Sequence, residues 1–172
     1  MGKLEARHLE IGEIVLIEYE PFFNVDWTIN RIYTGFVRKI YPNGKITTSN
    51  RIINTKEYAD STTFLELGIK NLGRVQKPSQ RALHGPNNYK IGDLVANIIG
   101  DTDPKNNKTV VGFITHKYDD RVIISNYWPH AGRPLFKRIS YDFSYSNDMI
   151  VIESAERIKE FYKSRDNPFN KI

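Results

Sequence analysis

The chain reads IGEIV at residues 11–15 and, 80 residues later, IGDLV at residues 91–95. Two further matches follow in the same order: TGFV at 34–37 with VGFI at 111–114, and ITTSN at 46–50 with VIISN at 122–126. Their offsets of 77 and 76 residues differ from the first by only a few loop residues. The alternative explanation is a chance likeness between two β-rich halves. Ordered matches at a nearly constant offset favour two copies of one folding unit.

Each copy is predicted to be built from short antiparallel strands. Residues 13–19 and 33–41 alternate apolar and polar side chains, as half-buried strands do. The turn at residues 41–45 contains Asn-Gly, which accepts positive φ at little cost, and residues 118–121 are its counterpart. Each half therefore reads as strand, loop, strand, tight turn, strand. Candidates for the fourth and fifth strands are residues 63–67 and 74–76 in the first half, and 137–141 and 149–153 in the second.

The sequence predicts an all-β protein with two tandem five-stranded SH3-like barrels and a C-terminal helix. The expected boundaries are 9–76 for the first barrel, 77–88 for a linker rich in Pro, Gly, Ser and Asn, 89–153 for the second barrel and 154–166 for the helix. Ser154 can cap this helix. Ile158, Phe161 and Tyr162 share one helical face, which we expect to pack on the second barrel.

The composition is that of an ordinary soluble protein. The chain has 172 residues, 40% of them hydrophobic, and a formal net charge of +5. No apolar run approaches the roughly 20 residues that a membrane helix needs, and the charged N-terminal residues predict no secretory signal. Because the chain has no cysteine, disulfides, thiol catalysis and cysteine-type metal sites are excluded. We therefore expect a cytoplasmic protein that does not contact a membrane.

The repeat resembles the KOW and Tudor-type families of SH3-like domains. The second half is the closer match, with its Gly-Asp opening at 92–93 and a central strand glycine, Gly112, which Gly35 matches in the first half. The first half departs from the pattern at Glu13 and in a long aromatic loop at 20–31. The resemblance implies binding to nucleic acid or polymerase rather than catalysis. A basic two-barrel chain of this size also resembles the MotB-type phage modifiers of transcription, which are associated with DNA.

No pattern for catalysis, a metal or a cofactor is found. The histidines lack the spacing of H-x-x-x-H or H-E-x-x-H sites. The Asp101-Thr102-Asp103 run lacks the glycine and distal glutamate of a calcium loop. Neither a phosphate-binding Gly-rich loop nor a G-x-S-x-G nucleophile turn occurs. We expect a protein that is not an enzyme.

Basic residues are segregated along the chain. Residues 27–56, 67–92 and 121–141 contain Lys and Arg but no Asp or Glu. Such stretches attract phosphates and release counterions, although solvated surface is the alternative. The candidate nucleic-acid-binding residues are Arg38, Lys39, Lys45, Arg51, Arg121, Trp128, Arg133, Lys137 and Arg138.

Arg38 and Trp128 differ from the rest of this set in their expected surroundings. Alternation places Arg38 on the face of Phe36 and Ile40, so Lys39 is expected to be better exposed. Trp128 follows a predicted strand, where its ring could stack on a base or lie at a groove edge.

The function expected from the sequence is non-catalytic binding of nucleic acid, DNA first and with weak sequence selectivity, in transcription or nucleoid organisation. Partners would include transcription or nucleoid proteins. One alternative is an RNA- or ribosome-associated module. Another is an adaptor that holds a peptide or polymerase through barrel edges or loop aromatics. Salt dependence separates them, because phosphate binding weakens steeply as salt rises.

Overall fold

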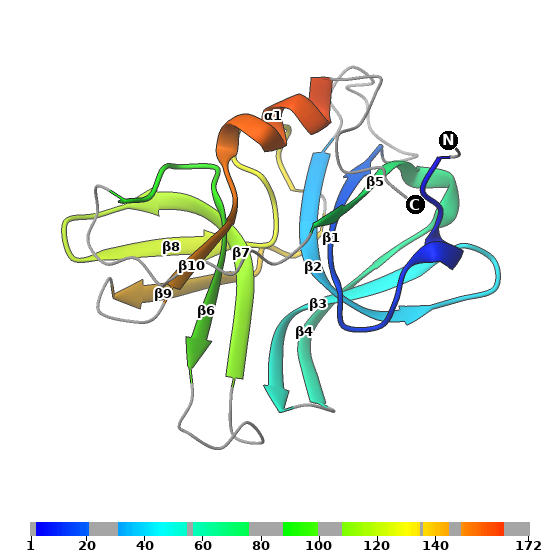
Figure 1. Ribbon diagram of the computed structural model, residues 1–172, viewed down its shortest axis with the longest axis horizontal. Helices are drawn as coiled ribbons and strands as arrows, with labels where there is room; N and C mark the ends of the chain where they lie inside the picture. Colours follow the sequence, from blue (N-terminus) through cyan, green and yellow to red (C-terminus); the bar gives the residue numbers. More distant parts are fainter. Residues whose placement is uncertain are drawn as a thin grey trace.

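The computed structural model describes residues 3–20, 31–54, 57–75, 88–99, 108–134, 136–144 and 149–163. These residues form ten strands, one α-helix and two short 3-10 helices, in the following order: η1 (Ala6–His8), β1 (Ile14–Tyr19), β2 (Arg31–Ile40), β3 (Ile46–Asn54), β4 (Glu57–Phe64), η2 (Glu66–Gly68), β5 (Ile69–Val75), β6 (Leu94–Ile99), β7 (Lys108–Lys117), β8 (Arg121–Ser125), β9 (Ser140–Ser144), β10 (Met149–Glu153) and α1 (Ala155–Lys163). The predicted all-β class with a C-terminal helix is confirmed (Figure 1). The predicted linker lies outside the described residues except for residue 88, as does the predicted end of the helix at 164–166.

The two halves repeat one scheme of antiparallel pairing. β1 pairs with β2 and β5, and β3 pairs with β2 and β4. In the second half β6 pairs with β7 and β10, and β8 pairs with β7 and β9. Even the register is shared, since Val15 lies opposite Gly35 just as Val95 lies opposite Gly112. The sequence repeat is therefore a repeat of structure.

Backbone conformation explains why the repeated opening motif contains glycine. Gly12 and Gly92 have φ of 91° and 96°, a region that side chains with a Cβ rarely adopt. This conformation lets each glycine N–H donate to a carbonyl of the second strand. Gly12 donates to Val37 over 2.6 Å, and Gly92 donates to Ile114 over 2.8 Å.

The ten strands form one continuous sheet, whereas two separate barrels would predict two sheets. The end of β3 pairs with the start of β7, where Arg51 lies opposite Val110. A bridge between Tyr33 and Tyr127 makes the reciprocal contact from the second half to β2. The two contacts involve equivalent positions of the repeat, so the halves meet around an approximate two-fold axis.

The described residues include three hydrophobic clusters. One belongs to the first half and includes Val37 and Phe64, and another belongs to the second half and includes Val110 and Phe143. The third combines residues of β1, β2 and β5 with residues of β6, β7 and α1. Ile158 and Phe161 of α1 are fully buried in this shared core. The helix packs on the second half as predicted, and its buried residues also lie in one cluster with residues of the first half, so α1 lies over the junction (Figure 1).

A β-bulge breaks the alternation predicted for β2. The pairing with β3 shifts register between Val37 and Lys39, which leaves Arg38 as the extra residue. Phe36 lies in the shared core, whereas Ile40 packs against the first-half core with Val37. Phe36, Arg38 and Ile40 therefore do not share a face, and Arg38 is exposed.

Strand boundaries were predicted less well where polar residues dominate. The expected fourth strand at 63–67 is β4 at Glu57–Phe64, and the expected fifth at 74–76 is β5 at Ile69–Val75. In the second half, β10 begins and ends as predicted, whereas β9 starts later than expected, at Ser140. The residues of β4 lack an apolar alternation, so their pairing with β3 determines the strand.

Candidate nucleic-acid interface

The tip of the β2–β3 hairpin carries two cations on one aromatic ring. The Nζ atoms of Lys39 and Lys45 lie 4.6 and 4.0 Å from the centroid of the Tyr41 ring. A hydrogen bond from Thr47 lowers the pKa of the Tyr41 hydroxyl, and the charges of the two lysines lower it further. Stacking on the ring holds both ammonium groups at the tip without neutralising them.

Hydroxyl groups extend this surface onto β4. The Arg38 side chain donates to the Ser61 hydroxyl over 2.7 Å, and the Thr47 and Thr63 hydroxyl oxygens lie 2.9 Å apart. We call this surface the cationic face; it consists of Arg38, Lys39, Tyr41, Lys45, Thr47, Ser61 and Thr63. Within the described part of the chain, no ion pair involves its three cations. The face therefore offers unneutralised charge and, at Ser61 and Thr63, exposed hydroxyl donors, which are the groups that contact phosphates.

A groove of about 690 Å³ lies beside the cationic face. It is lined by residues 60–63 of β4 and by residues 136–140. Lys137 and Arg138 are exposed on the far wall, and the Arg138 guanidinium lies 5.4 Å from the Tyr127 ring centroid. The groove thus brings Lys137 and Arg138 of the second half close to β4 of the first.

The one carboxylate on the groove wall already has partners. Asp60 lies 3.6 Å from the Arg51 side chain and accepts a hydrogen bond from the Tyr141 hydroxyl. Burial raises the pKa of Tyr141, and so does its bond to Asp60, so the hydroxyl remains a donor at neutral pH. The charge of Asp60 is therefore offset by Arg51. This pairing leaves Arg51 less available to a phosphate than the sequence predicts.

Arg121 is another predicted phosphate contact whose side chain already has carboxylate partners. It lies 3.2 Å from both Asp120 and Asp142, and its guanidinium stacks 4.4 Å from the Tyr118 ring centroid. Arg121 occupies the place of Lys45 in the repeat, at a hairpin tip on the opposite end of the molecule (Figure 1). The same cation–tyrosine arrangement is thus unneutralised in the first half and neutralised by two carboxylates in the second.

Trp128 is a core residue. Its side chain is 3% exposed, and its indole N–H donates to the Gly92 carbonyl over 3.0 Å. Its backbone N–H donates to Ile32 of the first half, which draws the segment across the junction and turns the ring inward. The expected contact of this ring with a base or groove edge does not fit its position. Arg133, by contrast, is exposed, and its carbonyl accepts a bond from Arg31.

The structure thus divides the predicted residues into groups. Arg38, Lys39 and Lys45 come together on the cationic face, and Lys137 and Arg138 lie across the groove. Sequence reasoning missed four uncharged members of the face: Tyr41, Thr47, Ser61 and Thr63. The only signal for them was a tyrosine between two lysines and a short Ser-Thr-Thr run, which also reads as a loop.

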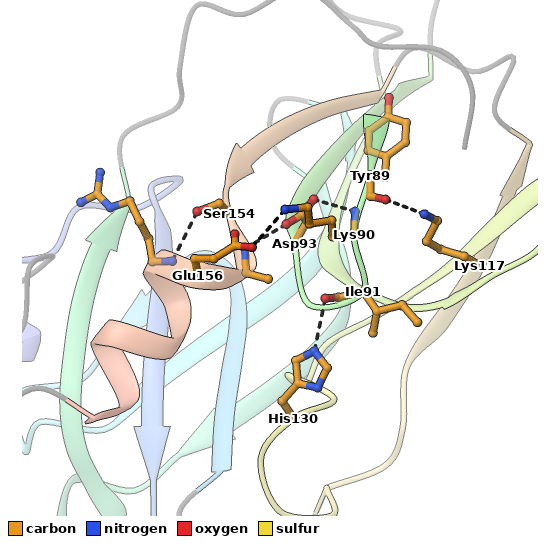
Figure 2. A network of polar contacts seen from close by, with 10 residues as sticks. Tyr89, Lys90, Ile91, Asp93, Lys117, His130, Ser154 and Glu156 are labelled. Carbon is orange, nitrogen blue, oxygen red and sulfur yellow. Dashed lines mark hydrogen bonds and ion pairs between the residues drawn. The ribbon is translucent and has the colours of Figure 1, made fainter. Parts of the chain in front are cut away.

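The acidic position of the repeated motif has a structural role. Asp93 accepts hydrogen bonds from the Lys90 backbone N–H over 2.9 Å and from the Ala155 backbone N–H over 2.8 Å (Figure 2). Burial raises the pKa of its carboxyl group. Glu13, its counterpart in the first half, instead pairs with Arg74 over 3.1 Å. Both acids are therefore engaged in holding the fold.

Among the residues that the structure describes, no group of three or more His, Asp or Glu side chains is placed to hold a metal ion. None of the described helices has the length and apolar character needed to span a bilayer. No protein-family model, curated protein or solved structure gives a significant match to the chain.

Proposed function

We propose that the protein is a non-catalytic nucleic-acid-binding protein whose principal ligand is DNA. The observation that carries this proposal is the cationic face, where Arg38, Lys39 and Lys45 have no carboxylate partner among the described residues. The equivalent tip of the second half neutralises its cation with Asp120 and Asp142. Because one chain contains both versions of the same hairpin, surface solvation alone does not explain why only one is left positive.

The proposed fold family follows from the strand pairing. We infer that each half is an SH3-like unit of the KOW or Tudor type, since each contains five short antiparallel strands paired in the same order. The resemblance suggests a role in transcription or nucleoid organisation in the cytoplasm, with transcription or nucleoid proteins nearby. RNA remains the alternative ligand and is an arm of the test below.

Binding at the cationic face would depend on the phosphate backbone. Ammonium and guanidinium groups neutralise phosphates and release condensed counterions, while hydroxyls such as those of Ser61 and Thr63 donate to phosphate oxygens. Neither kind of contact distinguishes one base pair from another. We therefore expect weak sequence selectivity and an affinity that falls steeply with salt.

The test is the double variant Lys39→Ala/Lys45→Ala. Fluorescence anisotropy with a labelled duplex at several salt concentrations would give the affinity and its salt slope. We expect the slope to fall by about one unit for each lost phosphate contact, and affinity to fall about equally for unrelated sequences. Single-stranded DNA and RNA of the same length would be measured in parallel to establish the preferred ligand.

Arg121→Ala is the matched control, because it removes a cation from the same place in the repeat. Its charge is already offset by two carboxylates, so its removal should leave the salt slope unchanged. Circular dichroism would verify that both variants are folded. An unchanged duplex affinity for the double variant at low salt would refute the proposed role of the face.

A further inference from the structure

The edge of β4 that faces away from β3 has no strand beside it. β4 pairs with β3 alone in the described sheet, and no backbone hydrogen bond joins it to residues 136–140 across the groove. Four consecutive residues of β4, 60–63, line the groove, so its wall is the strand edge itself rather than one face of alternate side chains. An open edge presents a row of backbone N–H and C=O groups that can pair with another chain.

The protection of this edge is confined to one part of β4. Natural edge strands often carry charged residues, Pro or irregularities, and β4 has its charges at Glu57 and Asp60. Its backbone is also irregular there, because Asp60 has a φ of 59° and the pairing with β3 shifts register between Ile52 and Asn54. The stretch from Ser61 to Phe64 remains regular and lies opposite residues 46–49 of β3.

The backbone chemistry of the groove distinguishes between two kinds of ligand backbone, a phosphodiester and a peptide. A phosphodiester backbone offers only acceptors, so it can satisfy the N–H groups of a strand edge but not the C=O groups. A peptide backbone in an extended conformation offers donors and acceptors in the alternation that the edge requires. The edge is therefore complementary to a peptide strand rather than to a nucleic acid.

The charges of the groove indicate the side chains of that peptide. Lys137 and Arg138 are exposed on the far wall, and the described residues provide neither with an ion-pair partner. Asp60 pairs with Arg51 and accepts from Tyr141, and it forms no ion pair with Lys137 or Arg138. Acidic side chains on the incoming strand would supply the missing partners.

We propose that the groove between β4 and residues 136–140 binds an extended acidic segment of a partner protein, which adds as a strand to β4. Backbone pairing with β4 supplies the affinity, and the contacts of Lys137 and Arg138 with carboxylates supply the selectivity. This site goes beyond the proposed nucleic-acid function and uses different cations, while Ser61 and Thr63 border both surfaces.

The experiment uses the full chain, labelled with ¹⁵N, and two acetylated peptides of about nine residues, the usual length of a long strand. The first peptide alternates Glu and Thr. The second has the same number of Glu residues but Pro in place of Thr, which removes alternate backbone donors while keeping the charge. We expect the first peptide to slow amide exchange within Ser61–Phe64 and to bind at least about tenfold more tightly than the second.

The variant Lys137→Ala/Arg138→Ala should weaken the Glu-Thr peptide by about tenfold, as expected for the loss of two charge-assisted contacts. Arg133→Ala, which removes an exposed cation outside the groove, is the control and should bind the peptide as the wild type does. Equal binding of the two peptides would overturn the strand-addition proposal. So would an unchanged rate of amide exchange within Ser61–Phe64 in the presence of the Glu-Thr peptide.

Failure of this proposal can be told apart from failure of the nucleic-acid proposal. Lys39→Ala/Lys45→Ala tests the cationic face with duplex DNA, and Lys137→Ala/Arg138→Ala tests the groove with peptide. If the peptide does not bind while the duplex does, only the groove proposal falls. If the duplex does not bind while the peptide does, only the nucleic-acid proposal falls.

Discussion

Gly35 and Gly112 occupy equivalent positions on β2 and β7, opposite Val15 and Val95. The reason for glycine at both is crowding, because neither has the positive φ seen at Gly12 and Gly92. A Cβ on Gly112 would lie 2.8 Å from the backbone oxygen of Ser125. At Gly35 the nearest atoms are 3.0 Å away and belong to the Thr48 side chain. At both sites, the absence of a side chain lets the neighbouring strand approach the glycine closely.

We predict that Gly112→Ala lowers the free energy of unfolding by about 1–3 kcal/mol, as overpacking typically does. Gly35→Ala should cost less, because its nearest backbone atom, the Ser49 oxygen, is 3.1 Å from the added Cβ, whereas the Ser125 oxygen is 2.8 Å from that of Gly112. Urea denaturation followed by fluorescence would compare the two variants. A Gly112→Ala protein as stable as the wild type would show that β7 and β8 can move apart without loss of folding stability, which would contradict the prediction.

Asp93 connects two elements, the turn before β6 and the start of α1. Its carboxylate accepts from the backbone of Lys90 and of Ala155, while Ser154 caps the helix by accepting from the Arg157 N–H over 3.3 Å (Figure 2). The predicted Ser154 cap is thereby confirmed. Because α1 covers the shared core, the attachment of one helix end affects both halves.

This attachment makes a pH-dependent contribution to stability. Burial raises the pKa of Asp93 above its value of about 4 in the unfolded chain, so the folded protein keeps the proton to higher pH. The stability contributed by this group is fully present below about pH 4 and is lost as the pH rises through the folded pKa. Asp93→Asn should remove that slope.

The same variant should be less stable at every pH, because an amide NH₂ cannot accept and one backbone N–H loses its partner. The expected cost is about 1–3 kcal/mol. Urea titrations of the wild type and of Asp93→Asn between about pH 4 and 7 would measure both effects. An identical dependence of stability on pH in the two proteins would contradict the assignment of the slope to Asp93.

At the scale of the whole molecule, the shared core decides how independent the halves are. Leu16 and Phe36 of the first half and Leu94 and Phe113 of the second lie in one buried cluster with α1. Separating the halves would expose this cluster to water. A repeat in sequence has therefore produced a single cooperative unit in structure, because the cores merge at the junction.

We predict one unfolding transition for the full chain, coincident by circular dichroism and tryptophan fluorescence. Residues 1–76 and 88–172, produced separately, should each fail to show a cooperative transition, and mixing them should restore native-like spectra. Size-exclusion chromatography of the mixture would detect the reconstituted complex. A cooperative transition in either isolated half would indicate that the shared core is not required for folding.

The sequence by itself determined that the two halves share one scheme of strands, because the matched segments fall on equivalent strands and the Gly12 and Gly92 turns need residues without a Cβ. Local composition was sufficient there, since turn glycines and apolar alternation act within a few residues. It was also sufficient for the hairpin tip at 41–45 and for the cap of α1.

Only the tertiary structure decided which cations remain available. Lys45 and Arg121 look alike in sequence, yet Asp142 approaches Arg121 only because β9 pairs with β8. Trp128 looked like an exposed loop ring, and a backbone bond to Ile32 of the other half placed it in the core. Contacts between segments distant in the chain carry no local signature, and such contacts formed the groove beside β4 and the core shared by the two halves.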